Sequence, residues 1–147
     1  MTNAIVECAR SWLGTRFHHQ GRVKKTVAHN GGVDCLGLLV GVANELQLTA
    51  PDGSPLAAAD DTRYSHLPDT LQLQHRLEAL LQEIPVEGIF PGCILLLSIN
   101  DNPQHLAIVS DWKDGLGIIH AYAQARKVVE HALDEYWKSR IIRAFQI

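Results

Sequence analysis

The sequence has no hydrophobic run long enough to cross a membrane, since its longest apolar run, around residues 94–99, has the length of a strand. The first residues carry neither the basic start nor the apolar run of a signal peptide. We therefore expect a chain that is synthesised in the cytoplasm without a signal peptide and that does not insert into a membrane.

Cysteine and net charge are also scarce. The three cysteines, Cys8, Cys35 and Cys93, cannot all pair within one chain, and no two of them have zinc-ribbon spacing. We expect free thiols, no metal and no other cofactor. A formal charge of −3 gives no reason to expect nucleic acid or an anionic membrane as a partner.

The remaining composition is that of a globular protein, with 46% hydrophobic and 20% charged residues in a chain of 147. This length fits one domain, which we expect to span residues 1–147. Asn3 can cap a first helix that Gly14 ends. A second helix over about 34–46 is apolar nearly all round, as in a buried helix, and a third is expected over about 70–83.

After Pro91-Gly92 the pattern changes to short apolar segments separated by turn residues, which predict strands. Helices followed by an antiparallel meander indicate an α+β fold, in which N-terminal helices pack on an antiparallel sheet of about five strands. The expected strands cover residues 93–99, 105–111, 116–122, 126–130 and 141–145, with a helical turn at 133–137 before the last.

Cys35 follows a glycine-rich turn and opens the second helix. A thiol at a helix N-terminus lies beside unpaired peptide N–H groups and the positive end of the helix dipole, which favour its thiolate. Cys35 is therefore a candidate nucleophile. The alternative is a small core residue, which is the usual role of a free cysteine.

Two of the eight histidines offer a base for this thiol, because His105 and His120 lie in predicted strands. For either residue alone, a hydrogen-bonded core or edge histidine is the simpler interpretation. If a loop over residues 111–114 joins the two strands, His105 and His120 are directly opposed, with Cβ atoms about 4.5–5.5 Å apart. A tighter turn centred on Asp114-Gly115 would keep both on one face but out of contact.

The expected chemistry is that of a nucleophile, a base and an orienting residue. His105 would take the proton of Cys35, leaving a thiolate beside an imidazolium, and His120 would fix the tautomer of His105. The peptide N–H of Cys35 and one side-chain donor would stabilise the oxyanion. A zinc site built from the same three side chains is an alternative of lower standing, since a structural site normally has four ligands.

Other candidate residues have simpler interpretations. Trp112 and Trp137 could line a cleft, although most tryptophans lie in cores and loops. Arg22 could meet substrate carboxylates, but a solvated position is the simpler expectation. Four histidines are expected on the surface: His29, His66, His75 and His131.

Several segments together resemble the NlpC family of bacterial cell-wall cysteine peptidases, and they follow the family's order along nearly the whole chain. The short length and His19-Gln20 are most similar to members encoded in phage and prophage tail operons. The matching segments are Trp12-Leu13-Gly14-Thr15-Arg16-Phe17, Val33-Asp34-Cys35-Leu36-Gly37-Leu38, Pro91-Gly92-Cys93-Ile94-Leu95-Leu96, His105-Leu106-Ala107-Ile108-Val109 and Ile119-His120-Ala121.

The resemblance implies a papain-like NlpC-type fold, with Cys35 as nucleophile, His105 as base and His120 as the third member of the triad. Many members have a tyrosine where Phe17 stands, and its hydroxyl is thought to help bind the oxyanion or the substrate. Phe17 has no such donor. The weaker candidates for oxyanion or substrate binding are Phe17, His18, His19, Gln20 and Asp34, although Asp34 is better explained as a helix N-cap.

The resemblance also implies a function. We expect an endopeptidase that hydrolyses the γ-D-glutamyl–diaminopimelate bond, or a similar bond, in peptidoglycan stem peptides. A phage tail or secretion assembly would deliver it to the cell wall and supply its protein partners. The alternatives are a non-catalytic tail or wall-binding module on the same scaffold, and a cysteine acyltransferase or deamidase that acts on a protein.

Overall fold

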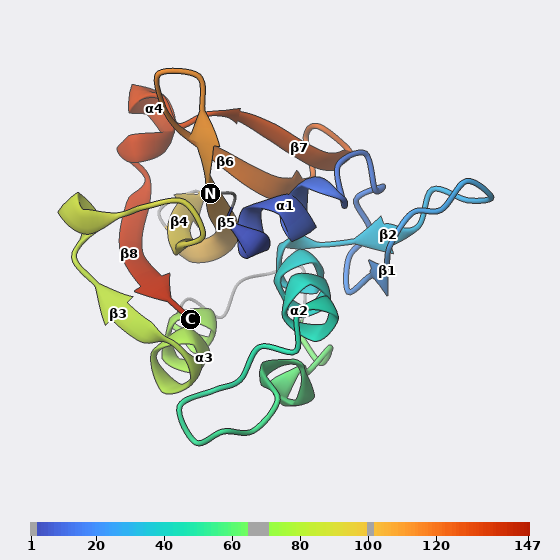
Figure 1. Cartoon of the computed structure of the whole chain (residues 1–147), viewed down its shortest axis with the longest axis horizontal. Coiled ribbons are helices and arrows are strands. Elements are labelled where there is room, and N and C mark those ends of the chain that lie inside the picture. Colours follow the sequence, from blue (N-terminus) through green and yellow to red (C-terminus); the bar gives the residue numbers. More distant parts are fainter. Residues whose placement is uncertain (1–2, 65–70, 100–101) are drawn as a thin grey trace.

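The computed structural model describes residues 3–64, 71–99 and 102–147. Helices dominate its first half, and strands follow one another in its second half (Figure 1). The part of the chain before the main strands contains helix α1 (Ala4–Arg10), helix α2 (Cys35–Glu45), the 3-10 helix η1 (Leu56–Ala59) and helix α3 (Gln72–Leu80).

The two predicted helix caps are present. Asn3 Oδ1 accepts hydrogen bonds from the peptide N–H groups of Ile5 at 3.0 Å and Val6 at 3.3 Å. Helix α1 ends at Arg10, and turns lead from there to Gly14, whose φ of 86° suits glycine. Asp34 caps α2, which fills the predicted range within one residue at each end.

The chain between α1 and α2 contains a small ribbon in which β1 (Arg22–Val23) pairs antiparallel with β2 (Gly32–Val33). The chain between these strands extends away from the rest of the molecule, on the right of Figure 1. Phe17 forms a bridge with Val33. This bridge holds the segment that contains Phe17 against Val33, which lies two residues before the start of α2.

The main sheet is antiparallel and has six strands within the described residues, in the order β3-β8-β4-β5-β6-β7. The predicted helix over 70–83 is too long, because α3 stops at Leu80 and residues 82–84 pair with the last strand. This edge strand is the one that the sequence pattern did not predict. The six strands are β3 (Gln82–Ile84), β4 (Ile94–Ile99), β5 (Asn102–Trp112), β6 (Gly115–Tyr122), β7 (Lys127–Ala132) and β8 (Ile141–Gln146).

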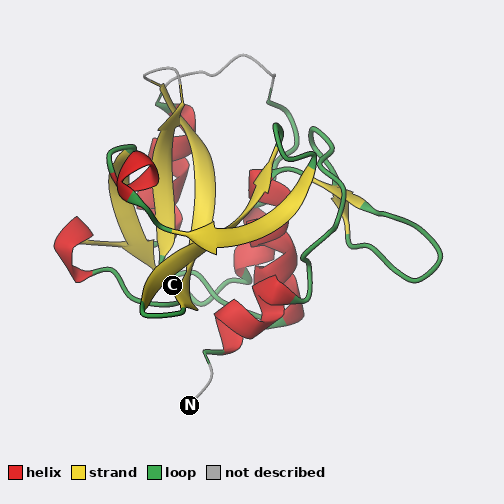
Figure 2. Ribbon diagram, turned by 90° about the horizontal axis from the view of Figure 1, so that it is seen from above, coloured by secondary structure: helices red, strands yellow, loops and turns green. Residues whose placement is uncertain are grey.

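The curved sheet separates two hydrophobic cores (Figure 2). The larger core lies between the sheet and helices α1, α2 and α3, and it receives Ile94 and Leu96 of β4. The smaller core receives the alternate residues Leu95 and Leu97 of the same strand. Strand β4 is therefore buried on both faces, which explains its continuous apolar sequence.

The short helix α4 (Glu135–Lys138) lies between β7 and β8 and contributes Trp137 to the smaller core. It starts at Asp134, whose side chain accepts a hydrogen bond from the Trp137 peptide N–H at 3.1 Å. The 3-10 helix η2 (Val86–Gly88) precedes β4. Across the described ranges, no helix has the length and apolar character needed to cross a membrane.

Candidate active site

Helix α2 positions Cys35 as its first residue, directly after the N-cap Asp34. The Asp34 side chain is buried and accepts a hydrogen bond from the Gly37 peptide N–H at 2.8 Å. This bond uses one of the free N–H groups of the first helical turn. The structural role expected for Asp34 is therefore confirmed.

Asp34 also joins the preceding loop to a later segment. Its carboxylate accepts hydrogen bonds from the Gln20 peptide N–H at 2.8 Å, from Arg22 Nη1 at 3.1 Å and from the Tyr64 hydroxyl. Arg22 also forms an ion pair with Asp60 at 2.9 Å. The guanidinium of Arg22 thus holds the N-terminus of α2 in place, and it is not the solvated group that the sequence suggested.

The remaining weaker candidates are residues 17–20, a segment whose first two residues pair with Val33. His18 donates its peptide N–H to the Val33 carbonyl at 2.9 Å, and its ring Nδ1 bonds to the His19 carbonyl at 2.9 Å. The ring of His19 meets that of Tyr64 edge-on at 5.4 Å. Gln20 donates its side-chain amide to the Tyr64 carbonyl at 2.6 Å. Tyr64 was not a candidate from sequence, since nothing local links it to Asp34.

The surroundings of the Cys35 thiol favour its protonated form. Burial raises the pKa of Cys35 and the negative charge of Asp34 raises it further, while the peptide N–H groups of Leu106, Leu36 and Cys35 act in the opposite direction. Both Cys35 and His105 belong to the described residues, and no hydrogen bond joins their side chains. Leu106 directly follows His105, so the thiol lies beside the strand segment that carries the candidate base.

His105, His120 and His131 form a hydrogen-bonded row across three neighbouring strands, which we call the histidine row. His105 Nε2 lies 2.6 Å from His120 Nδ1, and His120 Nε2 lies 2.8 Å from His131 Nε2. His131 Nδ1 lies 3.0 Å from the carbonyl oxygen of Ala132. Since Nε2 of His105 is taken by His120, Nδ1 is the ring nitrogen left for a thiol.

The register of this row differs from both registers considered for the hairpin. Ile108 pairs with Ile119, and continuing this register puts His105 level with Tyr122 rather than with His120. Lys113 and Asp114 alone form the connection, since Trp112 pairs with Gly115. The expectation that His105 and His120 are directly opposed is therefore wrong. Their rings still meet, because aromatic side chains reach diagonal neighbours across a strand pair.

His131 is not the surface residue that was expected. It is partly buried, and Ile118 is its partner across the β6–β7 pair. Because Val129 pairs with His120, His131 lies on the same face as His120, two residues further along β7. The predicted strand 126–130 stopped one residue short of His131. Extending the predicted strand by one residue and pairing it with 116–122 would have included His131 beside the strand that carries His120.

Trp137 covers the histidine row. Its ring centroid lies 5.0 Å from that of His120 and 5.5 Å from that of His131, and Tyr122 stacks on His120 at 5.1 Å. Trp137 is only 8% exposed. It therefore excludes water from the row and does not line an open cleft.

Burial lowers the pKa of His105 and of His120, and for His120 the neighbouring histidines lower it further. Both shifts favour neutral imidazoles, since a low dielectric disfavours the charged form. With the raised pKa of Cys35, they favour a neutral thiol beside a neutral base, contrary to the expected thiolate–imidazolium pair.

His29, His75, Cys8 and Cys93 lie outside this site. His29 and His75 are exposed, as predicted, and His66 lies outside the described residues. Cys8 and Cys93 are free thiols, and Cys93 is fully buried at the start of β4. In the described ranges, no three His, Cys, Asp or Glu side chains are arranged to hold a metal ion.

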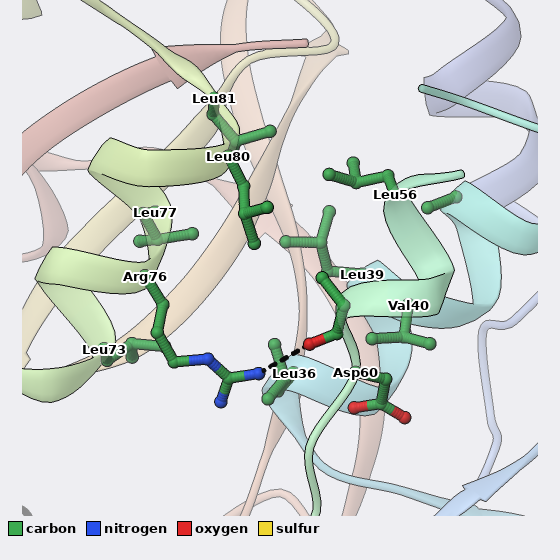
Figure 3. Close-up of a pocket in the computed structure, with 12 residues that line it drawn as sticks. Leu36, Leu39, Val40, Leu56, Asp60, Leu73, Arg76, Leu77, Leu80 and Leu81 are labelled. Atoms are coloured by element: carbon green, nitrogen blue, oxygen red, sulfur yellow. Dashed lines mark hydrogen bonds between the residues drawn. The ribbon is translucent and has the colours of Figure 1, made fainter. Parts of the chain in front are cut away.

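A separate apolar pocket lies between α2, η1 and α3 (Figure 3). Arg76 of α3 donates a hydrogen bond to the Ala59 carbonyl at 3.1 Å, and this bond links the two walls. None of the candidate catalytic residues lines the pocket, although Leu36 is the neighbour of Cys35. The lining residues are Leu36, Leu39, Val40, Ala43, Leu56, Ala59, Asp60, Leu73, Arg76, Leu77, Leu80 and Leu81.

Sequence comparison gives no relative: no family model matches the chain, and no curated protein matches it. Comparison of folds does find similar structures. The NlpC/p60 domain of the peptidoglycan hydrolase SagA superposes with a TM-score of 0.62 at 20% identity, over 98% of this chain and 97% of that one.

Two mycobacterial structures are also similar. The P60 domain of antigen MAP1204 from M. avium subspecies paratuberculosis has a TM-score of 0.59 at 15% identity, covering 97% of this chain and 90% of that one. The peptidoglycan hydrolase RipB from Mycobacterium tuberculosis has a TM-score of 0.57 at 16% identity, covering 98% of this chain and 62% of that one. The α+β fold expected from the sequence is confirmed, and this chain has the fold of NlpC/p60 domains.

Proposed function

We propose that this chain is a cysteine peptidase that hydrolyses an amide bond in peptidoglycan stem peptides. The observation that carries the proposal is the histidine row, whose first member lies beside the helix that starts with Cys35. A nucleophile, a base and an orienting group are the minimum set for covalent acyl transfer. Similarity in fold to the peptidoglycan hydrolases SagA and RipB supports this substrate class.

In the proposed reaction, His105 Nδ1 takes the thiol proton as Cys35 Sγ attacks the substrate carbonyl carbon. The oxyanion accepts a hydrogen bond from the Cys35 peptide N–H at the start of α2. His105 then gives the proton to the leaving nitrogen, the C–N bond breaks and a thioester forms. Water attacks the thioester, its proton passes to His105 and then to sulfur, and the free acid leaves.

The raised pKa of Cys35 and the lowered pKa of His105 suggest that proton transfer accompanies the attack. A neutral pair costs less to bury than two charges, so the site would stay neutral until a substrate arrives. Catalytic hydrogen bonds are often long in free enzymes and shorten when the substrate binds. This agrees with the missing bond between the two side chains.

The bond we propose is γ-D-glutamyl–diaminopimelate, on the resemblance of the Cys35, His105 and His120 segments to the NlpC family. The similarity of His19-Gln20 to phage and prophage members supports delivery by a phage tail or a comparable assembly. A non-catalytic wall-binding module is the second candidate, because Phe17 has no hydroxyl to offer an oxyanion.

Digestion of purified muropeptides, followed by mass spectrometry, tests the proposal. The wild-type chain should release products with a new amine and a new carboxyl group, and Cys35→Ala should release none. Cys8→Ala is the matched control, since Cys8 is also a partly buried thiol but lies in α1. Equal turnover by Cys35→Ala would overturn the mechanism, and binding without products in the wild type would favour the wall-binding module.

A further inference from the structure

The three hydrogen bonds of the histidine row have a direction, and the carbonyl of Ala132 sets it. A carbonyl oxygen can only accept, so His131 Nδ1, at 3.0 Å from it, must carry the proton. A neutral His131 then has its lone pair on Nε2. His120 Nε2, at 2.8 Å, must therefore be the donor in the next bond.

The tautomer of His120 in turn sets that of His105. A neutral His120 with its proton on Nε2 has its lone pair on Nδ1, so His105 Nε2 donates across the 2.6 Å contact. His105 is then left with an unprotonated Nδ1, which is the form that can accept the proton of a thiol. Burial lowers the pKa of His105 and His120, so each ring holds one proton.

We propose that His131 is a positioning residue whose acceptor nitrogen, fixed by the Ala132 carbonyl, holds His120 and His105 in the tautomers that leave His105 Nδ1 free. It would act through two other rings and would not touch the substrate. The catalytic part of this inference rests on the proposed function, but the protonation pattern does not.

The surroundings of His131 suit this role. Trp137 lies over it at 5.5 Å and over His120 at 5.0 Å, so little water can compete for the bond between the rings. Strand pairing holds the two residues on the same face, since Ile118 pairs with His131 and Val129 with His120. An aromatic cover and a fixed register are what a chain of hydrogen bonds needs to keep one polarity.

Nuclear magnetic resonance of the free protein, labelled with nitrogen-15 in histidine, tests the protonation pattern without any substrate. At pH 8, where an imidazole with an ordinary pKa of about 6.5 is neutral, we expect the Nε2–H form for His105 and His120 and the Nδ1–H form for His131. His131→Leu should remove the acceptor and give His120 a mixture of tautomers. A different wild-type pattern, or an unchanged one in His131→Leu, would overturn the proposal.

Rescue by a hydrogen-bond acceptor separates positioning from packing. His131→Gln offers an amide oxygen to His120 and should restore the tautomers, whereas His131→Leu fills similar space with no acceptor. On muropeptides we expect His131→Leu to lower kcat at least about tenfold with little change in KM, and His131→Gln to recover most of it. His75→Leu, at an exposed histidine of α3, is the matched control.

The two proposals can fail separately. A wild-type chain that cleaves no muropeptide but shows the expected tautomers would refute the proposed function and leave the role of His131 intact. An active enzyme in which His131→Leu and His131→Gln have equal kcat would refute the positioning role alone.

Discussion

His105 Nε2 and His120 Nδ1 lie 2.6 Å apart, although neither residue faces the other directly across the β5–β6 pair. Their rings meet along the diagonal, and His131 repeats the step on β7 at 2.8 Å. Diagonal neighbours on a sheet are close enough only for long or aromatic side chains. Three histidines can therefore form a continuous row across strands where smaller polar residues could not.

His105 is the proposed general base. His105→Ala should lower kcat on muropeptides by about 10²–10⁴-fold, which is the usual contribution of general acid–base catalysis. Because His105 is buried, far-ultraviolet circular dichroism should confirm that the variant folds, and His105→Gln offers a less disruptive change. His29→Ala, at an exposed histidine, should keep full activity. A His105 variant that folds and stays within tenfold of the wild type would exclude this residue as the base.

Folding stability should depend on pH in the acid range. Burial lowers the pKa of His105 and of His120 in the folded chain. At pH values between these lowered pKa values and about 6.5, the unfolded chain therefore binds more protons than the folded chain. The contribution of the two neutral histidines to the free energy of unfolding is fully present above about pH 6.5 and is lost as the pH falls below it. Urea unfolding at pH 7.5, 6 and 5 should show falling midpoints.

The control for this dependence is His120→Gln. It should lose stability at pH 7.5, since it removes a buried hydrogen-bonded ring, but its midpoint should fall less steeply toward pH 5 than that of the wild type. An equal slope in both chains would show that other groups cause the acid sensitivity.

The charge of Asp34 should slow the reaction of Cys35 with electrophiles. Asp34 raises the pKa of the thiol, so Asp34→Asn should lower that pKa and increase the thiolate fraction at a given pH. An asparagine keeps an oxygen for the N-cap bond to Gly37. We expect faster alkylation of Cys35 by iodoacetamide at pH 9, measured by peptide mass spectrometry.

Asp60→Asn is the matched control for this effect. Asp60 also pairs with Arg22, at 2.9 Å, but it is not among the groups that raise the pKa of Cys35. If Asp60→Asn accelerates alkylation as much as Asp34→Asn does, loosening of the Arg22 network would explain the result, and the charge effect would be refuted.

The turn between β5 and β6 stores a small strain that can be relieved. Lys113 has a φ of 44°, in the left-handed region that disfavours residues with a Cβ. Lys113→Gly should stabilise the chain by about 1 kcal/mol, read from the urea midpoint at constant m-value. Asp114→Gly, in the neighbouring position without a positive φ, should not stabilise it. Equal gains from both variants would contradict the assignment of the strain to Lys113.

Local patterns predicted much of this fold. The caps at Asn3 and Asp34, the buried helix α2 and the strands that match β4 to β8 all carry short-range signals. The edge strand β3 carries none, because its three residues acquire their conformation from pairing with β8, far along the chain. The apolar pattern of α3 runs on into this strand, which is why the predicted helix was too long.

The candidate site shows the same division. Cys35, His105 and His120 stand out by their sequence context, and whether they act as a triad stays a prediction. Tyr64 and Arg22 meet Asp34 only through the tertiary fold, so no spacing rule could link them. Recognising His131 from the sequence depended on the exact end of one predicted strand, and strand ends are the least certain feature of a sequence pattern.

The connection Lys113–Asp114 has a consequence for how this gene can change. Surface loops usually accept insertions at little cost, since doubling a loop's length adds only about 0.6 kcal/mol. Here a single inserted codon that slipped β6 by one residue would turn His120 to the opposite face of the sheet. Substitutions at Lys113 and Asp114 keep the register of β5 and β6, whereas an insertion that slips β6 by one residue removes His120 from the histidine row.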